Sequence, residues 1–206
     1  ARVDKNGGII WLRTLIPTDT FDNNPRQSHV IVDNQGNLVF LTTIYVSTNN
    51  TTGNNLTIAG TNRKTNAVTL NNHSLKGLKK GFHLVVVRFN KDGVLQGSKH
   101  LSSFDAGSSS CPYPCYGEFR VKAAVYHAGI GKLLVSGDFR GYWDIKNDSG
   151  GSIGNLSNKT RRPIPYLLVM NPSTRAFEQS WQMNRPFVNG AYSISNGEIS
   201  YKLAKS

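Results

Sequence analysis

The chain alternates short apolar runs with polar turns, and this pattern predicts pairs of antiparallel strands. Three segments share one order of apolar run, turn of Asn, Asp, Lys and Gly, and second run: RVDKNGGIIWLRTL from Arg2, HLVVVRFNKDGVLQGSKHL from His83 and YLLVMNPSTRAFEQSWQM from Tyr166. Each is typical of a β-hairpin, and Gly7 and Gly93 supply the positive φ that such turns need. In the third segment, Pro172 and Ser173 indicate a different turn.

A second kind of hairpin alternates with the first. Its copies are HVIVDNQGNLVFLTTIYV from His29, AAVYHAGIGKLLVSGDF from Ala123 and GAYSISNGEISYKLAKS from Gly190. Their turns contain Gly36, Gly129 to Gly131, and Gly197. No stretch repeats its apolar residues with the 3.6-residue period of a helix. The pattern therefore predicts an all-β fold with four strands per repeat, and the length of 206 residues suits one domain over 1–206.

The repeats lie far apart for blades of a β-propeller. The corresponding positions Val3, Phe89 and Met170 are separated by 86 and 81 residues, whereas propeller repeats have about 40 to 50 residues. The excess falls between the hairpins. We therefore expect loop insertions near 47–74, 105–118 and 146–163.

Two stretches of the chain resemble a known repeat family. VDNQGNLVFLTT is followed by HLVVVRFNKDGVL, and AGIGKLLVSGDFRGYWDI is followed by YLLVMNPSTRAF. Both stretches resemble the β-propeller repeats called SBBP, and the similarity covers most of the chain apart from the insertions. The third copy of the first hairpin departs most from the family pattern, with MNPSTR in place of the Asp/Asn-Gly turn. The resemblance implies a propeller, of a kind common on cell surfaces and in secreted proteins, and it implies no particular reaction.

The two ends of the sequence read as two halves of one blade. The N-terminal segment is a hairpin of the first kind and the C-terminal segment one of the second kind, and three blades are too few for a ring of four to eight. We expect the strands from Ala191 to Leu203 to pair with residues equivalent to Arg2 to Leu15, in another copy or in a longer parent chain. The alternative is that the halves join within one chain. Head-to-tail repetition would build a ring or a filament.

The charge balance favours acidic partners. Lys and Arg number 24 against 12 Asp and Glu, which gives a formal charge of +12. The positive residues are scattered apart from KGLKK (Lys76 to Lys80) and NKTRR (Asn158 to Arg162), and no nucleic-acid module surrounds either cluster. Acidic glycans or an anionic extracellular surface suit this charge. The longest apolar run, HLVVVRF, is too short to span a membrane.

Both cysteines lie in CPYPC, at Cys111 and Cys115. We expect a local disulfide, which is plausible in an oxidising compartment. A zinc half-site would need two more ligands, and a redox motif prefers two intervening residues at the start of a helix. Two free thiols in an intracellular protein are the remaining alternative.

Seven acceptor motifs for N-glycosylation lie in the expected insertions. They are at Asn49, Asn50, Asn55, Asn72, Asn147, Asn155 and Asn158. Loops are accessible to a glycosyltransferase, and we expect modification first at Asn55, Asn155 and Asn158. Together with the paired cysteines, the clustering indicates a secreted eukaryotic or viral glycoprotein. An alternative explanation is chance in a chain rich in Asn and Ser.

Few residues suggest chemistry. GGSIG (Gly150 to Gly154) matches a nucleophile motif, but polar residues flank it where a strand and a helix are required, so we expect a loop. Asp138 and Asp144 are candidate carboxylates for glycoside hydrolysis, although bonds to backbone or to Arg140 explain them as well. The five histidines lack metal-ligand spacing. We therefore expect no catalytic residue, no metal site and no cofactor.

Aromatic residues are the remaining candidates for ligand contact. Trp11 and Trp181 occupy matching positions in their repeats and are expected to pack between blades. Tyr142 and Trp143 lie beside a glycine in a loop-like step and are candidates for stacking on a sugar face. The sequence thus predicts a non-enzymatic extracellular structural or interaction glycoprotein. A carbohydrate-binding propeller is the first alternative, and a hydrolase using Asp138 or Asp144 is the second.

Overall fold

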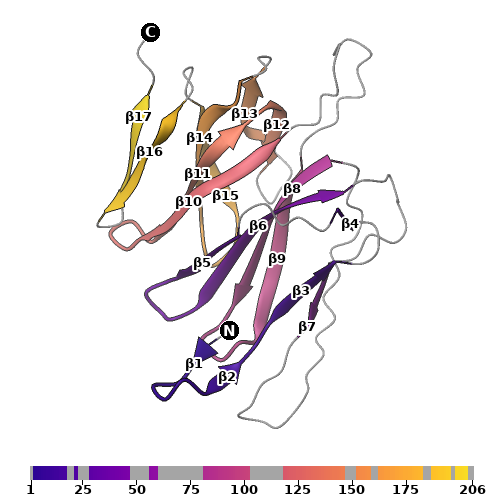
Figure 1. The fold of residues 1–206 in the computed structure, drawn as a ribbon, viewed down its shortest axis with the longest axis vertical. Helices are drawn as coiled ribbons and strands as arrows, with labels where there is room; N and C mark the ends of the chain where they lie inside the picture. The colour runs from indigo at the N-terminus through magenta and orange to yellow at the C-terminus, as the bar shows by residue number, and fades with distance from the viewer. Residues whose placement is uncertain are drawn as a thin grey trace.

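The protein is all-β. The computed structural model describes residues 2–17, 21–22, 28–46, 56–59, 81–102, 118–146, 152–158, 162–182, 187–195 and 198–203. Every regular element in these ranges is a strand and every pairing is antiparallel (Figure 1). Among these residues, then, no helix is available to cross a membrane.

The strands confirm the six hairpins expected from the sequence, β1–β2, β5–β6, β8–β9, β10–β11, β14–β15 and β16–β17. Their bounds are β1 Arg2–Val3, β2 Ile9–Trp11, β3 Thr14–Pro17, β4 Phe21–Asp22, β5 Ser28–Val32, β6 Leu38–Val46, β7 Leu56–Ala59, β8 Gly81–Phe89, β9 Leu95–Ser102, β10 Phe119–His127, β11 Lys132–Phe139, β12 Gly141–Lys146, β13 Ser152–Asn158, β14 Ile164–Met170, β15 Phe177–Gln182, β16 Phe187–Ser195 and β17 Glu198–Leu203.

Each of the two larger sheets combines one hairpin of the first kind with one hairpin of the second kind. The first sheet has the order β5-β6-β8-β9, with β4 also paired to β6, and the second sheet has the order β10-β11-β14-β15. The predicted repeat of four strands is therefore present twice. Hairpins β1–β2 and β16–β17 each form a two-stranded sheet, and the pairings described for this chain do not join one to the other.

Two of the expected insertions contain strands. Hairpin β12–β13 occupies part of 146–163, and β7, within 47–74, pairs with β3. The expectation that Gly150 to Gly154 is a loop is wrong for Ser152 to Gly154, which begin β13. The physical reason is apolar burial, because Trp143, Ile145 and Leu156 of this hairpin lie in the core.

The tight turns and the long connections lie at opposite ends of the sheets. In an antiparallel sheet, successive connections alternate between the two ends. The turns within hairpins β5–β6, β8–β9, β10–β11 and β14–β15 therefore share one end, which we call the turn end. The connections that leave β6, β9 and β11 share the other, the insertion end.

Four tight turns are built by the same side-chain contact. An Asp or Asn at the start of the turn accepts hydrogen bonds from two backbone N–H groups of that turn, which replaces the backbone partners lost in the bend. These residues are Asp4, Asp33, Asn90 and Asn171. In the first three turns a glycine adopts positive φ, as at Gly93 (78°), whereas Arg175 takes that role in the fourth (64°). The different turn predicted from Pro172 is confirmed.

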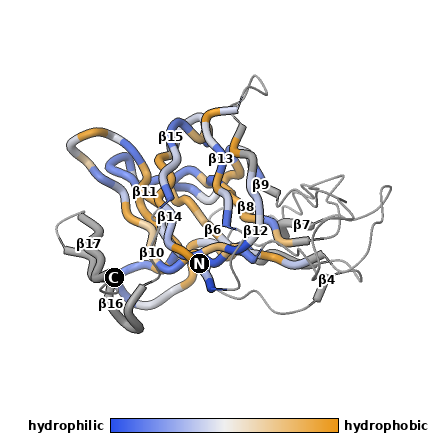
Figure 2. Tube along the Cα trace, turned by 90° about the horizontal axis from the view of Figure 1, so that it is seen from above, coloured by the Kyte–Doolittle hydropathy of each residue, from blue (hydrophilic) through white to orange (hydrophobic). Residues whose placement is uncertain are grey.

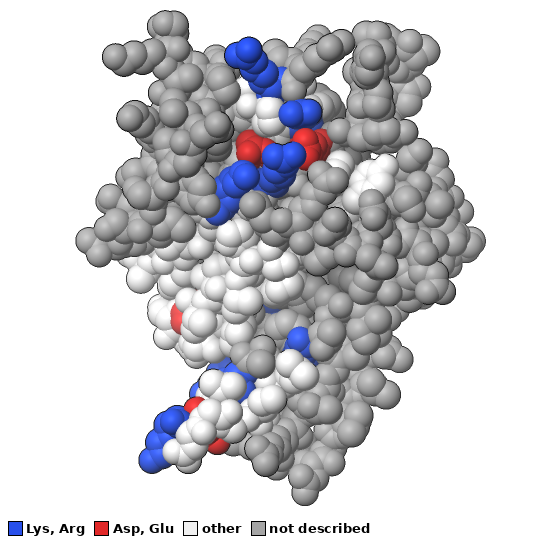
Figure 3. Space-filling model, viewed as in Figure 1, with Lys and Arg blue, Asp and Glu red and all other residues white. Residues whose placement is uncertain are grey.

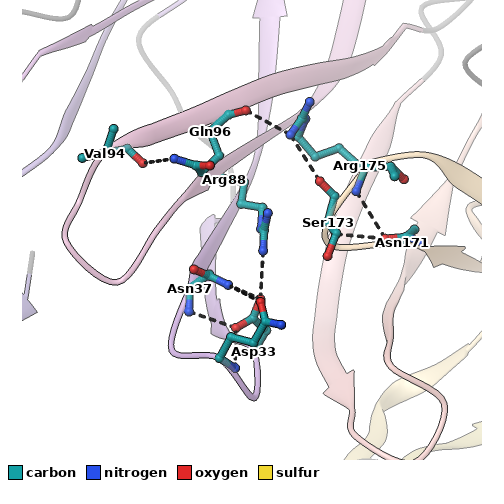
Figure 4. Close-up of polar contacts among 10 residues, drawn as sticks. Asp33, Asn37, Arg88, Val94, Gln96, Asn171, Ser173 and Arg175 are labelled. Atoms are coloured by element: carbon teal, nitrogen blue, oxygen red, sulfur yellow. Dashed lines mark hydrogen bonds and ion pairs between the residues drawn. The ribbon is translucent and has the colours of Figure 1, made fainter.

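Asp33 connects its turn to the sheet. Its carboxylate accepts hydrogen bonds from the backbone and side-chain nitrogens of Asn37 at 2.9 Å and pairs with Arg88 at 3.4 Å (Figure 4). Burial by itself raises the pKa of Asp33, but the bonds from Asn37, Gln35 and Arg88 outweigh burial and lower it. The ionised carboxylate is thus part of the folded turn.

The main core lies between the two larger sheets. It joins one face of the first sheet, with Leu41 and Leu84, to one face of the second, with Val135 and Tyr166. Figure 2 shows apolar positions along β6, β8, β11 and β14, where these layers meet. The ring of Phe119 stacks on Tyr166, with centroids 4.1 Å apart. A hydrogen bond also connects the two sheets, because the Nε2–H of His29 on β5 donates to the Val121 carbonyl on β10, at 3.2 Å.

Contacts between successive layers repeat at the turn end. Trp11, four positions after the positive-φ residue Gly7, lies against Gly93, the positive-φ residue of the next layer. Gly97, four positions after Gly93, lies against Arg175, the positive-φ residue of the layer after that. A large side chain contacts a glycine in both cases. The earlier layer supplies the large side chain in the first contact, and the later layer supplies it in the second.

Hydrogen bonds hold both contacts. The Trp11 Nε1–H donates to the carbonyl of Lys91 at 3.3 Å, and Arg13 donates to that of Gly93 at 2.8 Å. The Arg175 guanidinium donates to the carbonyl of Gln96 at 3.1 Å (Figure 4). Each layer is therefore tied to the backbone of its neighbour.

Trp181 does not share the environment of Trp11. Trp11 is 2% exposed, as expected for packing between layers, whereas Trp181 is 48% exposed. Trp181 lies six residues after Arg175 and Trp11 only four after Gly7, so the two tryptophans are not at matching positions. The expectation that Trp181 packs as Trp11 does is wrong, because the position that corresponds to Trp11, four residues after Arg175, is Gln179.

We predict that Gly93→Ala destabilises the protein more than Gly36→Ala. Both glycines have a φ of 78°, so each substitution costs about 1–2 kcal/mol of left-handed strain. A Cβ at Gly93 would lie 2.6 Å from Trp11, whereas one at Gly36 meets only Lys91 at 3.8 Å. Displacing Trp11 should cost about 1–3 kcal/mol more.

Urea unfolding followed by tryptophan fluorescence measures both free energies. Gly36→Ala is the matched control for backbone strain. Equal losses in the two variants would show that the Trp11 contact does not limit the space at this turn.

Candidate binding site at the insertion end

Five charged residues form a ladder on one face of the second sheet, where β10 begins and β11 ends. They are Glu118, Arg120, Lys122, Asp138 and Arg140, which we call the charge ladder. Side chains of a strand point alternately to its two faces. Phe119 and Val121 therefore lie in the core, while the charged residues that alternate with them along β10 lie on the opposite face.

The register places opposite charges beside one another. Arg120 lies directly across from Asp138, and the Arg140 N–H donates to the Glu118 carbonyl at 2.8 Å, which extends the ladder by one step. The Arg120 guanidinium pairs with the Glu118 carboxylate, with its Nε at 2.8 Å, and the Arg140 Nε lies 3.7 Å from the same carboxylate. Glu118 thus orients Arg120 by hydrogen bonds, while Arg140 lies within ion-pair distance and its buried Nε makes no hydrogen bond.

Asp138 is the most buried member of the charge ladder. Its partner is Lys122, at 3.9 Å, while its Oδ1 is buried without a hydrogen-bond donor. Burial raises the pKa of this carboxyl, and the positive charges of Lys122 and Arg120 offset part of that rise. The cost of burying a carboxylate is therefore only partly compensated.

The positive groups are the more accessible part of the charge ladder. The side chains of Arg120 and Arg140 are 35% and 43% exposed, whereas that of Glu118 is 12% exposed. Figure 3 shows these blue and red side chains gathered over the start of β10. The arrangement presents oriented guanidinium groups outward over half-buried carboxylates. Such groups recognise carboxylate, sulfate or phosphate groups.

The candidate carboxylates are not brought together as a catalytic pair by any described contact. Asp138 lies on β11 and pairs with Lys122 rather than with Arg140, the partner considered from the sequence. Asp144 lies on β12, where its backbone pairs with Asn155. The ladder residues Glu118, Arg120 and Lys122 were missed at the sequence level, although their period-two spacing in EFRVK was visible.

The candidate ligand contacts Tyr142 and Trp143 point to opposite faces of β12. Trp143 is fully buried, stacks near Phe119 and donates its indole N–H to the Arg140 carbonyl at 3.1 Å. The expectation that Trp143 contacts a ligand is therefore wrong, because alternation along this strand directs it into the core. Tyr142 is 39% exposed and stays accessible.

Two of the seven acceptor asparagines lie in the described part of the chain. Asn155 is exposed on β13. Asn158 is 5% exposed, and its Nδ2 donates to the carbonyls of Phe139 and Arg162 at 3.0 and 2.8 Å. Modification at Asn158 is therefore not compatible with this fold, because the nitrogen that would bear the sugar is buried and bonded. The predicted sites Asn49, Asn50, Asn55, Asn72 and Asn147 lie outside the described residues.

Other predicted features have no structural description or no assembled site. Cys111, Cys115 and the Lys76 to Lys80 cluster lie outside the described residues. The rings of His83 and His100 are 6.0 Å apart. Within the described ranges, no group of three or more His, Cys, Asp or Glu side chains is placed to hold a metal ion.

Comparisons with known proteins leave the fold and the site to be interpreted from this structure alone. No family model, no curated protein and no solved structure matches this chain.

We predict that Asp138→Asn becomes increasingly favourable to stability as the pH rises. The folded pKa of Asp138 lies above its ordinary value of 3.8. Stability from this carboxyl is therefore fully present below that value and is lost as the pH rises through the raised pKa, because the unfolded chain ionises more readily. The asparagine variant does not titrate, so its free energy of unfolding should gain on that of the unmodified protein across this window.

Urea unfolding over a pH series measures the difference, and Asp92→Asn at an exposed turn position is the control. A difference that is constant with pH, or that favours aspartate as the pH rises, would contradict the effect of burial.

Proposed function

We propose that this chain is a non-enzymatic interaction module of an extracellular protein, built from β-propeller blades. Its insertion end binds an anionic partner of the acidic-glycan class through the charge ladder. The observation that supports this most directly is the position of the ladder. Oriented, accessible arginines lie where the long connections leave the sheets, and loops on a rigid scaffold commonly hold binding residues.

The charge of the whole chain supports an anionic partner. A formal charge of +12 attracts anions over a distance and accelerates their encounter. Direct contact then requires groups with fixed directions, which Arg120 provides because Glu118 accepts its hydrogen bonds, and Arg140 adds a second positive charge beside the same carboxylate. An exposed Tyr142 on the neighbouring hairpin offers a ring face for a sugar.

The repeated contact between layers supports a propeller. Trp11 on Gly93 and Arg175 on Gly97 relate three successive layers by the same step along the chain. Layers related in this way, two of which contain the four-stranded repeat, are typical of propeller blades. The β1–β2 and β16–β17 hairpins would then be the outer and inner halves of a divided blade.

An extracellular location is supported by the acceptor motifs. Asn155 is exposed, and Ser157, the hydroxyl residue of its motif, is exposed as well. The Cys111 to Cys115 disulfide remains part of this proposal, since such a bond persists in oxidising compartments.

We predict that Arg140→Gln weakens binding of a heparin oligosaccharide about tenfold. Hydrogen bonds to charged groups contribute about 1.5–3 kcal/mol each, and tenfold corresponds to about 1.4 kcal/mol. Isothermal titration calorimetry at low ionic strength measures the dissociation constant. Lys5→Gln is the matched control, because it removes one positive charge from an exposed position at the turn end.

Equal weakening by both variants would mean that net charge and not the charge ladder attracts the ligand, and absence of binding would reject the acidic-glycan partner. Turnover of a glycoside substrate by the unmodified protein, lost in Asp138→Asn, would instead establish the hydrolase alternative, in which the half-buried Asp138 acts as the acid.

We predict that secretion from a eukaryotic cell attaches a glycan at Asn155 and none at Asn158. The mass lost on glycosidase treatment measures the attached sugar. Relative to the unmodified protein, this loss should be smaller by one glycan in Asn155→Gln and the same in Asn158→Gln. The second variant should lower the free energy of unfolding by about 1–3 kcal/mol, because the carbonyls of Phe139 and Arg162 lose their donor and the Asn158–Phe139 bond is buried. A protein with no attached sugar and two free thiols would contradict the extracellular proposal.

A further inference from the structure

Three hairpins in successive layers share one register. In β1–β2, β8–β9 and β14–β15, the cross-strand pair beside the tight turn is apolar, and the pairing shifts by an irregularity of the β-bulge type immediately next to it. A bulge changes the direction in which the following side chains point. Because the three hairpins are built alike, their corresponding positions can be compared. We call the apolar pairs the turn pairs, and they are Val3–Ile9, Phe89–Leu95 and Met170–Phe177.

In both larger sheets the turn pair is covered by the layer before it. Phe89 of the first sheet is 5% exposed, and its ring centroid lies 6.1 Å from that of Trp11 on β2. Met170 and Phe177 of the second sheet are fully buried, in the core that the first sheet also lines. The Nζ of Lys99, on β9 of the first sheet, lies 5.7 Å from the centre of the Phe177 ring. A turn pair is thus a surface on which another layer packs.

The turn pair of β1–β2 is open. Val3 is 56% exposed and Ile9 is 45% exposed. The adjoining turn leaves space as well, because a Cβ at Gly7 would have no atom within 4 Å. Stacked repeats are usually closed by terminal layers with polar outer faces, which keep the protein soluble. Hairpin β1–β2 instead ends in an apolar pair of the kind that is covered in the other two layers.

Two positions of each hairpin contact the layer that follows. They lie four and six residues after the positive-φ residue of the turn. On β2 they are Trp11, which packs on Gly93, and Arg13, which donates to the Gly93 carbonyl at 2.8 Å. On β9 they are Gly97 and Lys99, which contact the turn and the turn pair of the second sheet.

On β15 the same two positions are exposed. They are Gln179 and Trp181, which we call the β15 face, and Trp181 is 48% exposed. Gln179 pairs with Val169 and Trp181 with Leu167, whereas the core contains the alternate residues of β14. The β15 face therefore lies on the side of the second sheet that is turned away from the first. A contact surface for a following layer is present here and is not covered.

We propose that the β15 face is the docking surface for the open turn pair of a second copy of this chain. Trp181 lies over Ile9 of that copy, as Lys99 lies over the turn pair of the second sheet within one chain. Gln179 enters the space beside Gly7. Large aromatic side chains such as tryptophan contribute strongly at the centres of interfaces. The proposal rests on the layered arrangement of the proposed function and does not depend on the charge ladder.

The interface is heterologous, because the two copies use different surfaces from opposite ends of the stacked layers. Docking continues the contact between layers by one further step, so no new type of packing is needed. Each added copy covers one open turn pair and leaves its own exposed. Repetition closes into a ring or continues as a filament, depending on the rotation between copies.

Light scattering tests the proposal. The unmodified protein should have a mass above that of one chain, 22.7 kDa, and the mass should increase with concentration. Ile9→Lys and Trp181→Ser should each remain at one chain, because each removes one of the two surfaces. Ile130→Lys is the matched control, because Ile130 is 56% exposed but lies in the β10–β11 turn. This control should associate as the unmodified protein does.

Mixing the two variants establishes that these surfaces bind each other. Ile9→Lys retains the β15 face and Trp181→Ser retains the open turn pair, so the mixture can form one intact interface. It should reach the mass of two chains and no more. Circular dichroism and urea unfolding establish that each variant is folded, and if Ile9→Lys is not, Val3→Lys replaces it.

Tryptophan fluorescence gives a second measurement. Of the three tryptophans in the chain, Trp11 and Trp143 are already buried, so a change in exposure on association reports Trp181. The emission of the unmodified protein should shift to shorter wavelength as its concentration rises. Ile9→Lys retains all three tryptophans, and its emission should not shift.

A single-chain mass for the unmodified protein at every concentration would overturn the proposal, as would association of Ile9→Lys. Failure of the mixture to form pairs would show that the two surfaces do not bind each other, and association without an emission shift would exclude Trp181 from the interface. Heparin binding by the monomeric Ile9→Lys variant is measured separately, so failure of self-association and failure of the proposed ligand site are distinguished.

Discussion

The rest of this structure depends on the contacts in which a large side chain of one layer packs on a glycine of the next layer. The Trp11 ring packs directly on Gly93, and the Arg175 side chain packs directly on Gly97. A hydrophobic core tolerates similar side chains in many positions, but the contact at Gly93 is specific because a Cβ there would overlap Trp11, and one at Gly97 would lie tightly against Arg175. They determine which layer faces which, and so determine the faces that remain open.

The position of the charge ladder follows from the same stacking. Because one face of β10 and β11 packs toward the first sheet, the alternate residues of these strands must lie on the opposite face. Glu118 and Asp138 are held there among Arg120, Lys122 and Arg140, and the half-buried environment strengthens their interactions relative to exposed pairs. A structural pattern of alternation thus produces the oriented cations that we propose for ligand binding.

Local interactions made the hairpins predictable. Four of the six contain a turn in which Asp or Asn bonds to the backbone of that turn, as Asp33 and Asn90 do, and such short-range chemistry is visible in the residues themselves. The same reasoning failed at Asn158 and Trp143. Both look like loop residues, yet hairpin β12–β13 covers the core and buries them. A segment rich in Asn, Ser and Gly gives no local sign of the surface against which it packs.

The sequence by itself determined the six hairpins, the difference between the Asn171 turn and the glycine-containing turns, and the excess of positive charge, because all of these depend on neighbouring residues or on composition. The tertiary structure decided which faces are covered. Trp11 lies against Gly93 of the next layer and is buried, whereas Trp181, two positions further from the end of its turn, is exposed. Glu118 and Arg120 lie near Asp138 because the start of β10 pairs with the end of β11, although these segments are separated along the chain by most of the hairpin. Contacts of this kind depend on how layers meet, which no local pattern specifies.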